Sequence, residues 1–444
     1  MRKLCASIAV FFGLAGFMAI RFFLLADPSF QLDSEDYVNS MIAASIADMD
    51  MSGVKFGMPV LSYEDVKFNN HGFGKESADK CEVLYLVRHS RELDSSQLKV
   101  AGTRKQQLGI QGWGVYFLSR VHQIVRLDPK YFYHGLRMLN TLLLALILVG
   151  ISFQLRKAYD ALFALCFYCM CSLSVWLTNF APNLYWVPFT WFMPMLFGLM
   201  CMNYPEHRRW IYPLVFLSIV LKCLCGYEYI TNVMMCAVVF SAAEYFACTS
   251  DDLPRKKLMF RITLGVGLSA LAGFITAITF HAYIRGDGSI LQGLNEIYHA
   301  DVLRRTFGSP EDFPSVYTDS LNASILKVLA KYLFSRSSMW LALVLCVLVS
   351  ASSYSAKAKH HIRIRHDVSL FVMSFLSSIS WFVLAKSHSY IHVHMNFVLW
   401  QMPFIPAASY IFLRQRISVI APGLEKHYDE ALRFIGRIFF MRSA

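Results

Sequence analysis

Three carboxylates stand close together near the start of the chain, in the segment Asp33-Ser34-Glu35-Asp36-Tyr37. They follow the first long apolar stretch directly, which predicts that they lie at a membrane surface. A carboxylate held there can act as a general base that accepts the proton of an attacking hydroxyl. A second interpretation stays open, in which Ser34 or Asp33 caps a helix while Glu35 and Asp36 complement its dipole.

A second group of reactive side chains lies late in the chain, between positions 386 and 396. It contains Lys386, His388, His392 and His394. Lysine and histidine donors suit a lipid phosphate, whose negative charge they stabilise as it leaves. Two alternatives stay open: zinc or manganese ligation by the histidines, and a solvated loop without a ligand. Because no acidic or cysteine ligand lies nearby in the sequence, we predict no metal site.

Four further residues are candidates for contacts to a sugar or an acceptor: Arg88, Gln111, Trp113 and Glu228. Gln111 and Trp113 suit the hydroxyl groups and the apolar face of a sugar, although a loop turn followed by an interfacial tryptophan explains them equally well. Glu228 lies near the end of an apolar run, where burial of an ionisable group is usually functional. Its alternative role is to neutralise Lys222. In the second outer loop, Asp301, Arg304 and Arg305 are candidates only for shaping a lid, and they are not counted among the site residues.

The composition identifies the kind of protein that must hold these residues. Of 444 residues, 56% are hydrophobic and only 16% are charged, against roughly 25% charged in a soluble domain. Apolar runs long enough to cross a bilayer recur along most of the chain. The net charge of +12 comes from short basic bursts between these runs, as in cytoplasmic loops. The sequence therefore predicts membrane lipids, and no nucleic acid, as partners.

The apolar runs predict an all-α polytopic membrane protein with about ten transmembrane helices. The predicted order along the chain is a first helix (1–26), a large outer loop with amphipathic surface helices (27–134), helices two to seven (135–283), a second outer loop (284–335), helices eight to ten (336–413) and a basic tail (414–444). The surface helices are predicted at 35–47 and 113–125, and the apolar runs 160–178 and 395–413 are each predicted as one span. The basic linkers all fall on one side, which predicts that both termini are cytoplasmic. The carboxylates and the histidines then meet on the opposite, outer face.

Two short motifs resemble those of a known family. Asp33 and Tyr37, directly after the first helix, resemble the catalytic first-loop motif of the GT-C glycosyltransferases. The segment Gln107-Leu108-Gly109-Ile110-Gln111-Gly112-Trp113 is similar to a Gly-Leu-Gln-Gly segment common in bacterial GT-C-like proteins. The layout, with a large first outer loop and histidines in the last one, resembles the type-specific O-antigen glucosyltransferases of serotype-converting bacteriophages.

This resemblance implies a reaction. The expected enzyme moves a sugar, with glucose favoured, from undecaprenyl-phosphate sugar to a lipid-linked O-antigen or other surface glycan, and inverts the anomeric centre. It implies Asp33 as the base, with Glu35 and Asp36 as weaker candidates, and it requires no cofactor. The expected location is a bacterial inner membrane, with the active site facing the periplasm. Two rivals remain: a polymerase or ligase of lipid-linked glycans, and a transporter or flippase.

Overall fold

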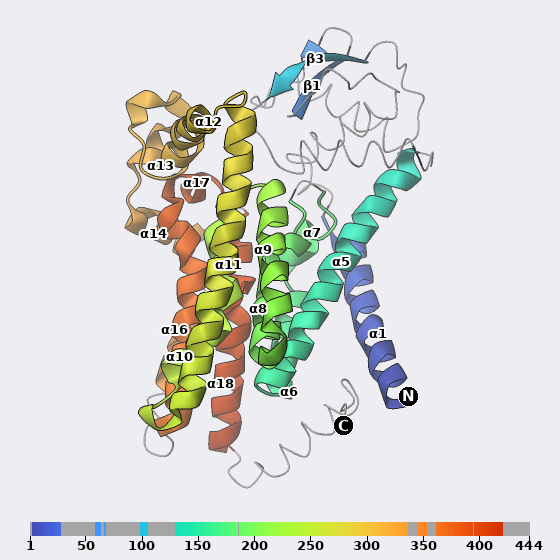
Figure 1. Ribbon diagram of the computed structural model, residues 1–444, viewed down its shortest axis with the longest axis vertical. Coiled ribbons are helices and arrows are strands. Elements are labelled where there is room, and N and C mark those ends of the chain that lie inside the picture. Colours follow the sequence, from blue (N-terminus) through green and yellow to red (C-terminus); the bar gives the residue numbers. More distant parts are fainter. Residues whose placement is uncertain are drawn as a thin grey trace.

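Helices make up most of the computed structural model, and they run roughly side by side along its long axis (Figure 1). The structure describes residues 2–27, 58–63, 66–67, 98–104, 124, 129–184, 186–335, 344–352, 361–393 and 395–420. The longer helices are α1 (Arg2–Leu25), α5 (Pro129–Ala158), α6 (Ala161–Ser172), α8 (Phe189–Asn203), α9 (Arg208–Leu224), α10 (Ile230–Ala247), α11 (Leu253–Arg285), α14 (Ile325–Ser335), α16 (His361–Leu384) and α18 (Phe404–Ile420). The shorter ones are α7 (Val175–Phe180), α12 (Ile290–Ile297), α13 (Thr318–Asn322) and α17 (Lys386–Ile391), and residues 344–352 are also helical.

Five helices of the described chain are long and apolar enough to cross a membrane. They cover Ser7–Leu25, His134–Ala158, Ile230–Ala247, Ser250–Arg285 and Ile364–Leu384. Two further apolar helices, α6 and α8, are shorter. The chain is therefore an α-helical membrane protein, as the composition predicts. The finer count of ten spans stays a prediction.

Two predicted spans differ from the helices observed. The predicted span 160–178 is divided, because α6 ends at Ser172 and α7 begins after Ser174, whose hydroxyl accepts a hydrogen bond from the Leu177 amide (3.2 Å). Such a side-chain cap gives the backbone a local alternative to continuing the helix. The predicted span 395–413 begins instead as a 3₁₀ helix, Asn396–Gln401, and α18 follows Pro403.

A small antiparallel sheet lies in the first predicted loop, where the sequence analysis expects only helices. Strand β1 (Met58–Tyr63) is central, between β2 (Val66–Lys67) and β3 (Leu98–Arg104). The expectation of an all-α fold is therefore wrong for these segments. They are short and contain Val60, Tyr63, Val66, Val100 and Thr103, residue types that favour strands, and helical spacing elsewhere in the loop hid this signal. The predicted helices at 35–47 and 113–125 fall almost wholly outside the described residues.

The two ends of the bundle differ in character. One end, which we call the loop end, carries α12, α13, α14, α17 and the sheet (Figure 1). The other, which we call the basic end, holds the last turn of α5 and the first turns of α9 and α11, with Arg156, Lys157, Arg208 and Arg255. Near the end of α1, the Asp27 amide donates to Asn179 Oδ1 (2.9 Å) at the end of α7. The large first loop therefore leaves the bundle from this anchor.

Buried ion pairs join the helices at the basic end. Glu244 of α10 accepts from Arg255 of α11 (2.6 Å) and pairs with His366 of α16 (3.2 Å). Asp367 of α16 pairs with Arg414 of α18. Both carboxylates are buried, and a buried charge is tolerated only with such partners. These pairs fix four helices at one level.

Glycines allow the helix backbones to approach closely, a common packing mode in membranes. Gly198 of α8 lies so near α10 that a Cβ atom there would clash with the carbonyl oxygen of Ala237. Gly273 of α11 lies in the same way against the Phe216 carbonyl of α9. α8 and α10 can therefore lie this close together only because residue 198 is a glycine, which has a hydrogen atom where other residues have a side chain.

Gly198→Ala is expected to lower the melting temperature of the purified protein, because overpacking a fixed contact costs about 1–3 kcal/mol. Gly267→Ala in α11 is the matched control, since its Cβ would meet only Val238 Cγ1 at 3.8 Å. Thermal unfolding in detergent measures both variants. Equal melting temperatures for the two would contradict the close approach of α8 and α10.

Candidate functional site

Glu228 lies in a tight turn between α9 and α10, at the loop end of both helices. Gly226 has φ +120° and Tyr229 has φ +64°, so the turn uses left-handed backbone twice. The Lys222 ammonium is buried and donates to the Gly226 carbonyl (2.6 Å). A Cβ atom on Gly226 would clash with Glu228 Oε2. The turn therefore holds the buried Glu228 carboxylate against the backbone of Gly226.

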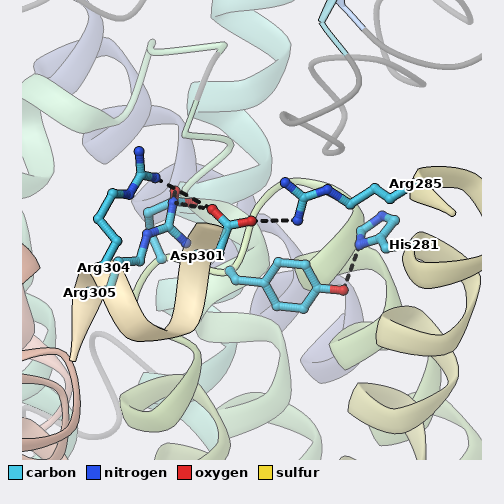
Figure 2. Close-up of polar contacts among 7 residues, drawn as sticks. His281, Arg285, Asp301, Arg304 and Arg305 are labelled. Atoms are coloured by element: carbon cyan, nitrogen blue, oxygen red, sulfur yellow. Dashed lines mark hydrogen bonds and ion pairs between the residues drawn. The ribbon is translucent and has the colours of Figure 1, made fainter. Parts of the chain in front are cut away.

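Asp301 is the centre of a charged cluster beside this turn. Figure 2 shows its carboxylate between Arg285 on one side and the pair Arg304 and Arg305 on the other. Asp301 forms an ion pair with Arg285, and its Oδ1 lies 3.4 Å from Arg304 and 3.8 Å from Arg305. Arg305 also reaches Glu228 Oε1 at 3.6 Å. We call these five residues the Asp301 cluster.

The charges in the Asp301 cluster do not balance. Its five described residues hold three guanidinium groups and two carboxylates, so that their net charge is one positive charge. The nearby buried Lys222 adds a second. Positive charge gathered in a partly desolvated place attracts an anion more strongly than the same groups would in water. The cluster is therefore suited to binding a phosphate.

Local sequence explains how these residues meet. Asp301 lies in a π-helical turn (Tyr298–Leu303) that continues α12, and Arg304 and Arg305 follow at the i+3 and i+4 positions, on the same helix face. Arg285 is the last residue of α11. The chain then reverses, and a Cβ on Gly293 would clash with the Ala282 carbonyl, so α12 can pack directly on α11. This reversal brings residue 301 back to residue 285.

A chain of aromatic rings connects this region with α16 and α17. The Tyr229 ring lies between Trp186 (stacked, 5.9 Å between centroids) and Trp381 (edge-on, 5.7 Å). Trp381 in turn meets His388 edge-on at 5.7 Å, and His388 lies 4.4 Å from His392. In the described structure, Trp381 Nε1 and His388 Nδ1 are buried without a hydrogen-bond partner. Such buried groups call for a polar ligand or a water molecule.

Lys386 is buried, and its ammonium group already has acceptors. It donates to the carbonyl oxygens of Leu321 (2.6 Å) and Ala323 (2.8 Å), at the end of α13. A cation suits the negative end of a helix, so this lysine ties α17 to α13. Its predicted contact with a phosphate stays a prediction, and the two carbonyls leave one ammonium hydrogen for it.

Burial keeps the pKa of the His388 imidazole well below its ordinary value, and His392, Arg305 and Arg304 lower this pKa further. His388 is therefore neutral near pH 7, with one ring nitrogen able to donate and the other able to accept. The electrostatic effect of both arginines on His388 also indicates that the Asp301 cluster and the histidines form one region.

Most of the predicted site residues fall outside the described residues: Asp33, Glu35, Asp36, Arg88, Gln111, Trp113 and His394. Of the others, the structure brings Glu228 into the Asp301 cluster, and it places His388 and His392 at the end of the aromatic chain. Glu228 pairs with Arg305, and the buried Lys222 donates to the Gly226 carbonyl while the Glu228 charge also acts on it. The predicted alternative, in which Glu228 and Lys222 neutralise each other, stays a prediction.

The sequence assigns no role to Arg285, and it proposes Asp301, Arg304 and Arg305 only as lid residues, not as site residues. The spacing of the last three, with an acid followed by two arginines one helical turn later, was the available signal. No protein-family model, curated protein or solved structure matches this chain. The function must therefore be argued from these residues.

Gly226→Ala is expected to destabilise the Glu228 turn more than backbone strain alone explains, because the new Cβ also displaces the carboxylate. Gly288→Ala is the matched control: Gly288 likewise has a positive φ (+101°), but its nearest neighbour, Tyr283 Cε2, is 3.9 Å from the added Cβ. In both variants the alanine adopts a backbone conformation that costs about 1–3 kcal/mol of strain. A melting temperature for Gly226→Ala no lower than that of Gly288→Ala would contradict the described turn.

Acidification is expected to destabilise the protein partly through His388. Because the pKa of His388 is depressed in the folded state, the unfolded chain takes up a proton as the pH falls through about 6.5 and the folded chain does not. The contribution of neutral His388 to stability is thus retained above this pH and lost below it.

The melting temperature of His388→Gln should therefore fall less than that of wild type when the pH is lowered from 7.5 to 5. His299→Gln, which removes an exposed histidine, is the control and should behave as wild type; if His388→Gln does so too, the depressed pKa is refuted.

Proposed function

We propose that this protein is an inverting glycosyltransferase that takes a sugar, with glucose favoured, from a polyprenyl-phosphate donor. The acceptor is a lipid-linked O-antigen or another surface glycan. The observation that carries the proposal is the Asp301 cluster, which gathers an excess of positive charge at the end of the bundle where the first loop begins. A donor that is both a lipid and a phosphate ester needs such a place: cationic, partly buried and at the membrane surface.

The proposed reaction is a single displacement. The acceptor hydroxyl oxygen attacks the anomeric carbon, its proton passes to the Asp33 carboxylate, and the bond to the phosphate oxygen breaks with inversion. The polyprenyl phosphate leaves with the electron pair, and Arg304 and Arg305 stabilise its charge. Glu35 and Asp36 are the alternative bases. Asp33 lies six positions beyond Asp27, which is anchored at Asn179, so the loop that carries the base starts at this end.

The aromatic chain supports a sugar subsite next to the phosphate. Sugars pack their apolar faces on aromatic rings and use their hydroxyls for hydrogen bonds. Trp381 Nε1 and His388 Nδ1 are buried nitrogens in need of a partner, and the Trp381 ring meets Tyr229, the residue that follows Glu228. Lys386, His392 and His394 keep a supporting role toward the phosphate, as do Arg88, Gln111 and Trp113 toward the acceptor.

The proposal includes the finer topology. One arrangement places all the candidate residues on one face. It has ten spans in a GT-C fold, both termini in the cytoplasm, and an active site that faces the periplasm of a bacterial inner membrane. The separation of the loop end from the basic end supports it, because cytoplasmic loops are enriched in Lys and Arg.

A second candidate is a polymerase or ligase acting on polyprenyl diphosphate glycans. The three arginines around Asp301 favour it, since a diphosphate offers more negative charge than a monophosphate. A transporter is less well supported. Its substrate path would need ionisable groups deep inside several spans, whereas the described buried charges Lys222, Glu244, Arg285 and Asp367 lie near helix ends.

Asp33→Asn is expected to lower sugar transfer by about 100-fold or more, the usual contribution of a general base. Surface polysaccharide from cells with and without the protein is compared by mass. Wild type should add one hexose per repeat, and the variant should not. Glu311→Gln is the control, because it removes a fully exposed carboxylate at the loop end, and it should behave as wild type.

Two outcomes would contradict the proposal in different ways. Normal transfer by Asp33→Asn would remove Asp33 from the role of base. A change in glycan chain length with an unchanged repeat mass would identify the polymerase or ligase instead.

A further inference from the structure

The length of α11 fixes the level of the segment that follows it. Basic residues occupy its first turns as far as Arg261, and the stretch from Ile262 to Tyr283 contains no Asp, Glu, Lys or Arg and one histidine, His281. At 1.5 Å per residue this stretch is about 33 Å long, close to the ~30 Å of a bilayer core. Arg285 therefore lies at the membrane surface when Arg261 lies at the opposite one.

α12 is held at this same level. The chain turns at Gly286, and Gly293 packs on the Ala282 carbonyl so closely that no side chain fits between them. Ile297 is the other buried residue of this helix. α12 thus lies beside the last turn of α11 at the loop end (Figure 1), and it does not extend away from the membrane.

The remaining faces of α12 are sharply different in character. Leu291 (82% exposed), Leu294 (37%) and Tyr298 (51%) repeat at helical spacing and form one apolar stripe. Gln292, Asn295 and Glu296 are exposed on the other side. In the last turns of α11, Phe280 and Tyr283 are also exposed. Because α12 packs on these same turns through Gly293 and Ala282, exposed apolar side chains of both helices lie at one level.

We infer that α12 and the π-helical turn after it form an interfacial helix, whose Leu291, Leu294 and Tyr298 are buried in the outer leaflet of the bilayer at the loop end. The occupant of this surface is lipid: acyl chains meet the two leucines, and Tyr298 lies at the headgroups, where tyrosine is enriched. A soluble partner would leave unexplained why the exposed apolar side chains of α12 lie at the level where the apolar part of α11 ends. The inference requires only that α11 spans the membrane, not that the protein transfers sugars.

This placement has a consequence for the Asp301 cluster. Asp301 follows Tyr298 within the same π-helical turn, and Arg304 and Arg305 come one turn later. An interfacial α12 holds these side chains at the depth of the lipid phosphates. Any phosphate that they bind is then reached from within the leaflet and not only from the aqueous side.

The test uses a fluorescent amino acid inserted at position 291 of the full chain, in vesicles of phosphatidylcholine and phosphatidylglycerol. Quenching by a lipid that carries a nitroxide on its acyl chain is compared with quenching by aqueous iodide. The matched control has the same fluorophore at position 296, on the polar side. We expect the nitroxide to quench position 291 several-fold more strongly than position 296, and iodide to show the reverse order.

Two results would overturn the inference. Iodide quenching at position 291 as strong as at position 296 would place the stripe in water. Protection of position 291 from both quenchers would place a protein on it, such as a second copy of this chain. Position 294 serves as a replacement site if the variant at 291 does not fold, and the same outcomes apply.

Discussion

The contact of one carboxylate with three guanidinium groups is the constraint on which the loop end depends. Asp301 links the last residue of α11 to the helix turn that follows α12, and Arg305 extends the link to the turn between α9 and α10. Removing one partner of a buried ion pair costs far more than the pair contributes, because the other charge is left without compensation. The position of Glu228 and the fold of the segment after α11 are therefore held together by the same interaction.

The membrane explains where the buried charges of the bundle lie. Buried charges are costly in the apolar middle of the bundle, and the described ones gather toward its two ends. At the basic end, Glu244 and Asp367 are matched by Arg255, His366 and Arg414, and these pairs join four helices. At the loop end, the five described residues of the Asp301 cluster carry three guanidinium groups and two carboxylates. The network at the basic end is explained by stability alone, whereas the Asp301 cluster has a net positive charge that suits an anionic ligand.

The sequence predicts the fold class because apolar runs and basic linkers follow directly from the properties of a bilayer. It also finds Glu228, because an ionisable residue at the end of an apolar run is easily seen. It does not find Arg285 as the partner of Asp301, since their contact depends on a chain reversal through Gly286 and Gly293 that no periodicity reports. The carbonyl acceptors of Lys386 are hidden for the same reason: they belong to α13, more than sixty positions earlier. A residue type thus predicts a chemistry, but only the tertiary fold decides which side chains remain available for it.

The most direct measurement is the dependence of sugar transfer on donor concentration for Arg304→Gln, with Lys327→Gln in α14 as the control cation. The central claim is that Asp301 holds Arg304 and Arg305 where the donor phosphate binds. It predicts that the half-saturating donor concentration rises by about tenfold or more in Arg304→Gln, the effect of losing one charge-assisted contact to the phosphate. The same concentration stays unchanged in the control, whose lysine is exposed and outside the Asp301 cluster. Melting temperatures of both variants show whether the protein is still folded. A folded Arg304→Gln protein with the donor requirement of wild type would contradict the claim.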